Sequence, residues 1–270
     1  MITAENLSFT YENGRVALKN INLRIKKGEY VAILGHNGSG KSTLARHFNG
    51  LFIPSSGSVR VNGMDTKSDN DIIKIRQLVG MVFQNPDNQI VSAIVEEDIA
   101  FGPENLGIPS DEIRRRVKDS LKKVGMEGFE KNAPHMLSGG QKQKIAVAGV
   151  LAMKPACIVL DEPTAMLDPK GRRDIMKVIA ELHNEGITVI QITHNMDEAV
   201  LAKRVVVMHE GEIFTDTTPA KLFRDVDKLK FMGLEPPQIT KLMIRLGLKP
   251  ALTVDEAYRV ISSLKKGTVK

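Results

Sequence analysis

A glycine-rich segment near the N-terminus constrains the fold more than any other feature of the chain. The segment from Gly35 to Ser42 has the spacing G-x-x-x-x-G-K-[ST], and it lies between an apolar run, Tyr30–Leu34, and a helical stretch that starts at Lys41. Glycines at these positions let backbone N–H groups converge on phosphate oxygens, and the start of a helix adds partial positive charge. The segment predicts a loop that holds a nucleoside triphosphate, with Lys41 at the β- and γ-phosphates and the Ser42 hydroxyl on Mg²⁺.

Polar residues follow four apolar runs that have the pattern of buried parallel strands. Residues 31–34 lead into the glycine-rich loop, residues 79–83 into Gln84, residues 157–160 into Asp161 and Glu162, and residues 187–193 into His194. Ligands lie beyond the carboxyl ends of such strands. Asp161 suits a Mg²⁺-linked acceptor, and Glu162 is placed to take a proton from an attacking water. Alone, Gln84 is explained as a turn cap and His194 as a strand-end histidine, but together with the carboxylates they predict a hydrolytic site.

A second glycine-rich helix start lies at residues 137–141. Ser138 is a good N-cap, and Gly139 and Gly140 expose backbone N–H groups, so this is another helix terminus suited to an anion. A plain capped helix is the alternative. Because the chain has one phosphate loop, a phosphate bound here would belong to a nucleotide held by another subunit. The pattern favours a head-to-tail dimer with two shared sites.

Composition argues against disulfides and membrane spans. Among 270 residues there is one cysteine, Cys157, which excludes an internal disulfide and favours a reducing compartment. No stretch approaches the ~18 apolar residues that span a bilayer, and residues 1–10 lack the basic and apolar regions of a signal peptide. We expect a soluble, cytosolic protein.

The net charge of +6 resides in the C-terminal segment. Residues 1–220 hold 27 basic and 27 acidic residues, whereas residues 221–270 hold 11 basic and 5 acidic ones. A core that binds nucleic acid would carry the basic excess itself. We therefore expect no nucleic acid partner, and we interpret the basic tail as solvated surface.

The order of predicted elements gives an α/β fold with a P-loop nucleotide hydrolase core at residues 1–220. Residues 1–28 predict an N-terminal antiparallel β-subdomain with a turn at Asn13 and Gly14, and residues from about 86 to 150 predict an inserted helical subdomain. Beyond Pro219, helical spacing predicts three short helices, the last with a capping box at Thr253 and Glu256. Because they bury little, residues 221–270 are expected to form a small accessory or dimerisation domain that packs on the core or on a second copy.

Together these motifs resemble the ATPase subunits of ABC transporters, in the family's order, over about residues 1–220. The resemblance implies ATP and Mg²⁺ as cofactors, with Tyr11 stacked on adenine and Val16 beside it. The implied nucleotide-binding residues are Tyr11, Val16, Gly35, His36, Asn37, Gly38, Ser39, Gly40, Lys41, Ser42, Thr43, Gln84, Ser138, Gly139, Gly140, Gln141, Asp161 and Asp168. Residues 138–141 correspond to the signature that closes on the partner's γ-phosphate.

The same resemblance implies the chemical roles. Lys41, Gln84, Glu162 and His194 form the implied catalytic set, with Glu162 as general base and His194 as the switch histidine. The implied Mg²⁺ ligands are Ser42, Gln84 and Asp161, and Asp168 belongs to the loop that follows the catalytic carboxylates.

Three further segments, residues 83–91, 96–105 and 233–237, are similar to the A subunits of energy-coupling-factor (ECF) transporters. This similarity implies import of vitamins or transition-metal ions, driven by ATP hydrolysis at the cytoplasmic face of the cell membrane. The implied partners are a second A subunit, a membrane-embedded T subunit in the groove after Gln84 and, indirectly, S subunits. Residues 165–168 are similar to the first of the two A paralogues.

Four acidic residues, Glu96, Glu97, Asp98 and Glu104, are expected to face arginines of the T subunit, with a solvated charge run as the alternative. Three other hypotheses are an ATPase of a different ABC importer, a soluble ABC protein of repair or translation that acts on nucleic acid, and a regulatory subunit without turnover. The motifs fit a homodimer and a heterodimer equally, and the cargo is chosen by the S subunit.

Overall fold

Six strands form the central sheet, in the order β10-β9-β3-β8-β7-β6. Their bounds are β3 (Tyr30–Leu34), β6 (Val79–Val82), β7 (Cys157–Asp161), β8 (Thr188–Ile192), β9 (Arg204–His209) and β10 (Glu212–Thr217). The computed structural model describes residues 1–267, with side chains up to residue 264. All neighbouring strands pair in parallel except β10, which is antiparallel to β9. The expected α/β fold is confirmed, and the carboxyl ends of β3, β6, β7 and β8 meet at one edge.

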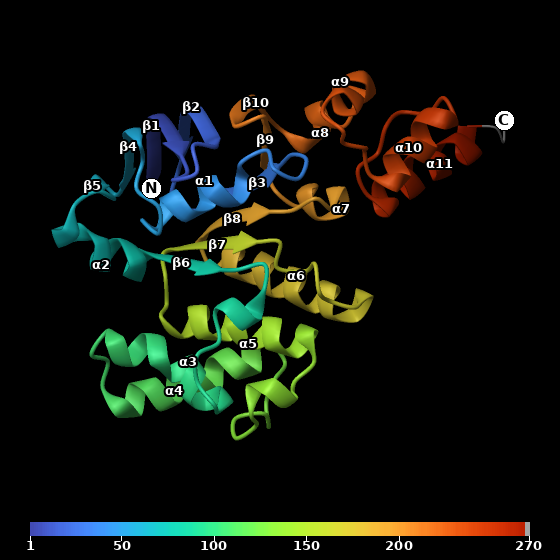
Figure 1. Cartoon of the computed structure of the whole chain (residues 1–270). Coiled ribbons are helices and arrows are strands. Elements are labelled where there is room, and N and C mark those ends of the chain that lie inside the picture. Colours follow the sequence, from blue (N-terminus) through green and yellow to red (C-terminus); the bar gives the residue numbers. More distant parts are fainter. Residues whose placement is uncertain (268–270) are drawn as a thin grey trace.

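A second, antiparallel sheet covers one side of the central sheet (Figure 1). Its strands lie in the order β2 (Val16–Ile25), β1 (Ile2–Thr10), β4 (Ser56–Val61) and β5 (Met64–Asp65). β1 and β2 are joined by the predicted turn, in which Gly14 has a φ of 81° and donates its N–H to the carbonyl of Tyr11 at 2.9 Å. The expected N-terminal antiparallel subdomain is present, and β4 and β5 extend it beyond what the sequence predicted.

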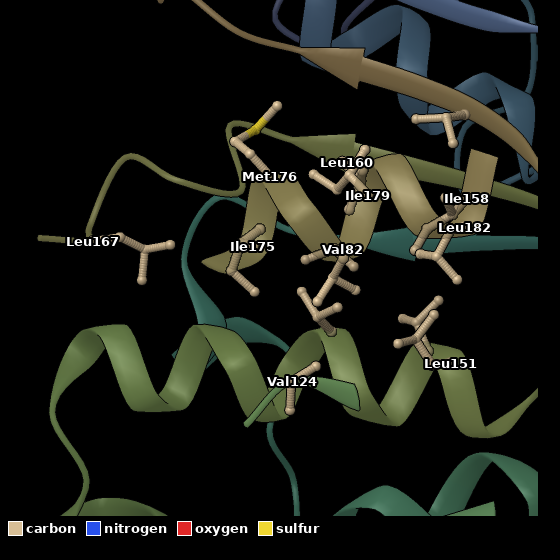
Figure 2. Packing of buried hydrophobic residues seen from close by; sticks show 14 of the residues in the cluster. Val82, Val124, Leu151, Ile158, Leu160, Leu167, Ile175, Met176, Ile179 and Leu182 are labelled. Atoms are coloured by element: carbon tan, nitrogen blue, oxygen red, sulfur yellow. The ribbon is translucent and has the colours of Figure 1, made fainter. Parts of the chain in front are cut away.

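Helices cover the opposite side of the central sheet (Figure 1). They are α3 (Val95–Asn105), α4 (Ser110–Lys123), α5 (Gly139–Ala152) and α6 (Pro169–Asn184). Figure 2 shows Ile175, Ile179 and Leu182 of α6 gathered with Leu160 of β7 and Leu151 of α5 in one apolar cluster. The helices α3 to α5 form the expected helical insertion between β6 and β7.

Both faces of β3 are buried, and its alternate residues enter two different cores. Tyr30, Ala32 and Leu34 belong to the cluster with α5 and α6, whereas Val31 and Ile33 belong to the cluster that includes the antiparallel sheet. Fully burying an apolar side chain of this size contributes about 1.5–3 kcal/mol. The strand that leads into the phosphate loop is therefore held from both sides.

Shorter helices connect these layers. They are α1 (Lys41–Phe48), α2 (Asp69–Leu78) and α7 (Met196–Ala199), together with the 3₁₀ turns η1 (Pro86–Asn88) and η2 (Pro134–Met136). The sequence did not predict α2, because only Ile75 on it is buried and no continuous apolar stripe marks it.

Within residues 1–267, four helices, rather than the three expected, follow β10. They are α8 (Pro219–Leu222), α9 (Val226–Phe231), α10 (Gln238–Arg245) and α11 (Val254–Gly267). The prediction of one helix after Pro219 was wrong, because the Asp225 side chain accepts from the N–H of Lys228 at 3.1 Å and starts a new helix.

The apolar residues of the C-terminal helices divide between two clusters. Phe223 and Leu229 enter the large core of the main body, whereas Met243, Ala251 and Ala257 form a small cluster of their own. The boundary near residue 220 stays a prediction. No helix within residues 1–267 has the length and apolar character needed to cross a bilayer.

An aromatic cluster surrounds His47 on α1. The His47 ring lies 4.8 Å from that of Phe9 and 5.9 Å from that of Phe52, centroid to centroid. Its Nδ1–H donates to the carbonyl of Thr43 at 2.8 Å, and its buried Nε2 has no hydrogen-bond partner among the described residues. Burial lowers the pKa of His47 to about 4, because a charged ring would leave a second buried N–H unpaired.

This burial predicts a pH-dependent stability. As the pH falls from about 6.5 to about 4, the unfolded chain takes up a proton that the folded His47 ring does not accept, so the free energy of unfolding should fall by up to about 1.4 kcal/mol per pH unit. His47→Phe keeps a ring beside Phe9 and Phe52 but does not titrate. Urea unfolding of both proteins across this pH range measures the difference, and equal pH dependence in the two proteins would contradict the prediction.

Candidate active site

The phosphate loop runs from the end of β3 into the first turn of α1. Gly40, the last glycine of the loop, has a φ of 101°, and a Cβ at this position would lie 2.7 Å from the carbonyl oxygen of Ala17. A side chain is therefore excluded both by the backbone conformation and by space. The spacing of the motif is the one that this turn requires.

The Lys41 ammonium folds back over the loop. It donates to the carbonyl oxygens of Gly35 and His36, both at 3.0 Å. Burial lowers the pKa of Lys41, while the negative charges of Glu162 and Asp161 act in the opposite direction. Because a buried ammonium is stabilised by a nearby anion, this position fits the predicted contact with phosphate groups.

The rest of the loop presents backbone groups and one hydroxyl. Asn37 and Gly38 are exposed, whereas Ser39 is buried and its Oγ has no hydrogen-bond partner among the residues that the structure describes. A buried hydroxyl without a partner costs free energy. A phosphate oxygen in the loop would supply that partner, so the residues present fit a bound triphosphate.

Ser42 and Asp161 join α1 to the end of β7. The Ser42 hydroxyl donates to Asp161 Oδ1 at 3.0 Å. Burial raises the pKa of Asp161, the hydrogen bond from Ser42 opposes that shift, and the neighbouring charge of Glu162 adds to it. A carboxylate that is 3% exposed and a hydroxyl beside it are oxygen ligands of the kind that Mg²⁺ prefers. The donor set therefore fits the predicted metal position.

Glu162 meets Gln84 and His194 at the ends of three strands. Gln84 Nε2 donates to Glu162 Oε2 at 2.8 Å, and His194 Nδ1 lies 3.3 Å from the same oxygen. Glu162 has a φ of 49°, a left-handed conformation that costs an L-residue about 1–3 kcal/mol, and its N–H donates to the carbonyl of Ile192 at 3.0 Å. In this conformation the Glu162 carboxylate contacts both Gln84 and His194.

Tyr11 lies beside the first turn of α1. Its hydroxyl is 2.8 Å from Thr43 Oγ1, and its ring packs edge-on against Phe9 and Phe52, with centroids 5.0 and 5.9 Å away. Val16 is exposed. The sequence did not predict Phe52 as a neighbour of Tyr11, because the two residues are far apart along the chain.

The second glycine-rich helix start is formed as predicted. The N–H of Gln141 donates to Ser138 Oγ at 3.3 Å, and the N–H of Ser138 donates to Gln141 Oε1 at 2.9 Å. Ser138 and Gly139 are exposed, so the turn faces solvent. Together with Gly140 and Asp168 they line a hollow of about 900 Å³.

Asp168 caps α6, since its Oδ1 accepts from the N–H of Gly171 at 2.7 Å. The structure thus brings Lys41, Ser42, Gln84, Asp161, Glu162 and His194 to one edge of the sheet. The helix start at Ser138 and the Asp168 loop lie in the separate hollow. The sequence did not predict a group of buried polar residues behind Glu162 and His194, because no local pattern marks them: Thr164, Gln191, Thr193 and Glu198.

The phosphate loop lies at one edge of the sheet, and the capped Ser-Gly-Gly helix start faces solvent in a separate hollow. Fold and site together define a P-loop ATPase of the ABC class. The family described as "ABC transporter" matches residues 18–165. The chain belongs to this family and, within it, to the ATP-binding proteins of energy-coupling factor transporters.

Two relatives support the assignment to energy-coupling factor transporters. The energy-coupling factor transporter ATP-binding protein EcfA1 of Clostridium novyi (strain NT) is 54% identical over 98% of this chain and 99% of its own length. The protein of the same name from Caldanaerobacter subterraneus subsp. tengcongensis is 58% identical over 91% of each chain. This chain is accordingly an ATPase subunit of the ECF type.

Solved structures of related ATP-binding proteins have the same fold. CbiO1 from Clostridium perfringens, described as part of the ABC transporter complex CbiONQ, is 44% identical, with a TM-score of 0.76 over 90% of this chain and 98% of that one. The ATP-binding cassette MJ0796, a dimer bound to ADP and Pi, is 34% identical, with a TM-score of 0.75 over 81% of this chain and 99% of that one.

The fit of Gly40 predicts the effect of a single added methyl group. Gly40→Ala should lower the affinity for ATP at least tenfold and destabilise the protein by about 2–4 kcal/mol, because it adds a clash with Ala17 to the strain of a positive φ. Gly63→Ala is the matched control, since Gly63 has a φ of 85° and nothing within 4 Å of its Cβ position. Nucleotide titration and thermal unfolding measure both effects, and an equal loss in the two variants would contradict the role of the clash.

Proposed function

We propose that two copies of this ATPase, or one copy and a paralogous A subunit, form a head-to-tail pair that holds two ATP molecules. In each site the loop at residues 35–42 of one subunit holds the triphosphate, and the helix start at Ser138 of the other closes over the γ-phosphate. The observation that carries this proposal is the exposure of Ser138 and Gly139 in a hollow apart from the phosphate loop. The dimeric cassette MJ0796 supports it.

Within each site we assign the residues by their chemistry. Lys41 neutralises phosphate charge, and Tyr11 and Val16 contact the adenine. Glu162 accepts the proton of the attacking water, while Gln84 and His194 hold its carboxylate in place through Oε2. Ser42, Asp161 and Gln84 would hold Mg²⁺, which supplies positive charge to the phosphate groups.

Removing the charge of Glu162 tests this assignment. Glu162→Gln keeps the size of the side chain but cannot accept a proton, so kcat should fall about 10²-fold or more while the affinity for ATP stays within about threefold. Glu127→Gln, at an exposed position outside the site, is the control. Steady-state ATP hydrolysis and equilibrium nucleotide binding measure the two quantities. Turnover near the wild-type rate would rule Glu162 out as the base.

A second proposal concerns the membrane partner. A hollow of about 240 Å³ follows the Gln84 loop and is lined by Leu51, Val91 and Phe101, all exposed apolar side chains. Asp98 stabilises the segment at Val91 and Ser92 beside this hollow, because its Oδ1 accepts from their N–H groups at 2.7 and 3.1 Å. We assign this groove to the membrane-embedded T subunit, through which S subunits act indirectly. The subunit would then work at the cytoplasmic face of the membrane, in the uptake of vitamins or transition-metal ions.

The four acidic residues near the groove have different surroundings. Asp98 lines the groove, whereas Glu96, Glu97 and Glu104 line a separate hollow of about 640 Å³ between α3 and α4. Glu96 also pairs with Lys131. A contact with arginines of the T subunit inside the groove would therefore depend on Asp98. Substituting an exposed apolar side chain of the groove is a more direct test of docking.

Phe101→Asp should reduce copurification of the T subunit about tenfold or more, because it places a charge in an apolar contact. Ile73→Asp is the matched control, since Ile73 is an exposed apolar residue of α2 outside the groove. Both variants should keep their basal ATP hydrolysis. The measurement is the amount of T subunit recovered with each tagged variant from detergent-solubilised host membranes. Equal recovery with Phe101→Asp and wild type would contradict the proposed docking groove.

A further inference from the structure

A buried carboxylate on α7 lies behind the reacting groups. Glu198 is 3% exposed and accepts three hydrogen bonds from buried side chains. Its Oε1 accepts from Thr164 Oγ1 at 2.6 Å, and its Oε2 accepts from Gln191 Nε2 at 2.8 Å and from Thr193 Oγ1 at 2.9 Å. A carboxylate buried at this depth is stable only when its oxygens are satisfied in this way.

These partners lie next to the two groups that meet at the site. Thr164 is two residues beyond Glu162, and Thr193 comes directly before His194. The Glu198 carboxylate therefore binds both the loop that carries Glu162 and the loop that carries His194. Glu162 Oε2 and His194 Nδ1 are 3.3 Å apart. The Thr193 hydroxyl also accepts from the N–H of Asn195 at 3.0 Å, which fixes the turn that carries His194.

The network has firm anchors on the sheet and on α6. Gln191 lies on β8 and accepts a hydrogen bond from the Tyr30 hydroxyl of β3, so Glu198 is tied to the strand that leads into the phosphate loop. The Nε atom of Arg172, on α6, lies 3.8 Å from Glu198 Oε1. One side chain thus connects β8, α6, α7 and the loop after β7.

We propose that Glu198 is a positioning residue for hydrolysis, which holds the Glu162 and His194 loops at the separation that the reaction requires. The inference rests on the proposed roles of Glu162 and His194. Positioning errors of about 1 Å can cost on the order of a hundredfold in rate, so loosening one shared anchor should affect turnover more than nucleotide binding. The residues assigned to hold the triphosphate lie outside this network.

Glu198→Ala removes the shared carboxylate, and Thr193→Val removes one hydroxyl that donates to it. Each variant should lower kcat about tenfold or more while KM for ATP changes less than about threefold. Glu198→Gln should restore kcat to within about threefold, because its amide can accept from Gln191 and Thr193 and donate to Thr164 Oγ1. Thr240→Val is the matched control. It removes another buried threonine hydrogen bond, at 2.6 Å to the carbonyl of Ala251, and should leave kcat unchanged.

A double-mutant cycle separates positioning from a general loss of structure. In a His194→Ala background, Glu198→Ala should lower the residual kcat less than about twofold, because the pair it positions is already broken. If Glu198→Ala lowered kcat by the same factor in the His194→Ala background as in the wild type, the proposal would be overturned. A Glu198→Gln variant as slow as Glu198→Ala would also overturn it. Thermal unfolding confirms that each protein is folded at the assay temperature, and Thr193→Val provides the test if Glu198→Ala does not fold. Wild-type turnover in Glu162→Gln would instead overturn the assignment of the base itself.

Discussion

Two buried charges of opposite sign at one edge of the central sheet are the constraint on which the rest of the site depends. Burial disfavours the charged forms of both Lys41 and Asp161, and the attraction that each exerts on the other opposes this cost. Carbonyl oxygens of the loop satisfy the ammonium, and the Ser42 hydroxyl satisfies the carboxylate. In the proposed function, a bound triphosphate would stabilise the Lys41 ammonium and a divalent cation would stabilise the Asp161 carboxylate.

The chemistry is divided between two regions of the surface and a buried support. The phosphate loop and the Glu162 group occupy the sheet edge, whereas the Ser138 helix start faces solvent in a different hollow. In the proposed pair, a second subunit brings these halves together, which would couple hydrolysis to association. Behind the edge, Glu198 connects the loops after β7 and β8 through hydrogen bonds to Thr164 and Thr193.

Much of the fold could be predicted because its signals are local. The apolar runs of β3, β7 and β8 mark strands buried on both faces, and the glycine and lysine spacing of the loop reflects a positive φ at Gly40 and a backbone carbonyl at close range. Elements with weaker local signals were missed. Only Ile75 of α2 is buried, and the split between α8 and α9 depends on a single cap at Asp225.

Local patterns in the sequence were enough to predict which polar residues follow β3, β6, β7 and β8, because strand burial and turn chemistry are properties of short segments. Which of those residues meet depends on the tertiary structure. It placed Gln84 and His194 on the same oxygen of Glu162, set Asp98 rather than Glu97 in the groove, and joined Glu198 to Thr164, which is 34 residues away along the chain. Such contacts depend on strand order and loop conformation, which no local pattern contains, because they arise when distant segments share one core.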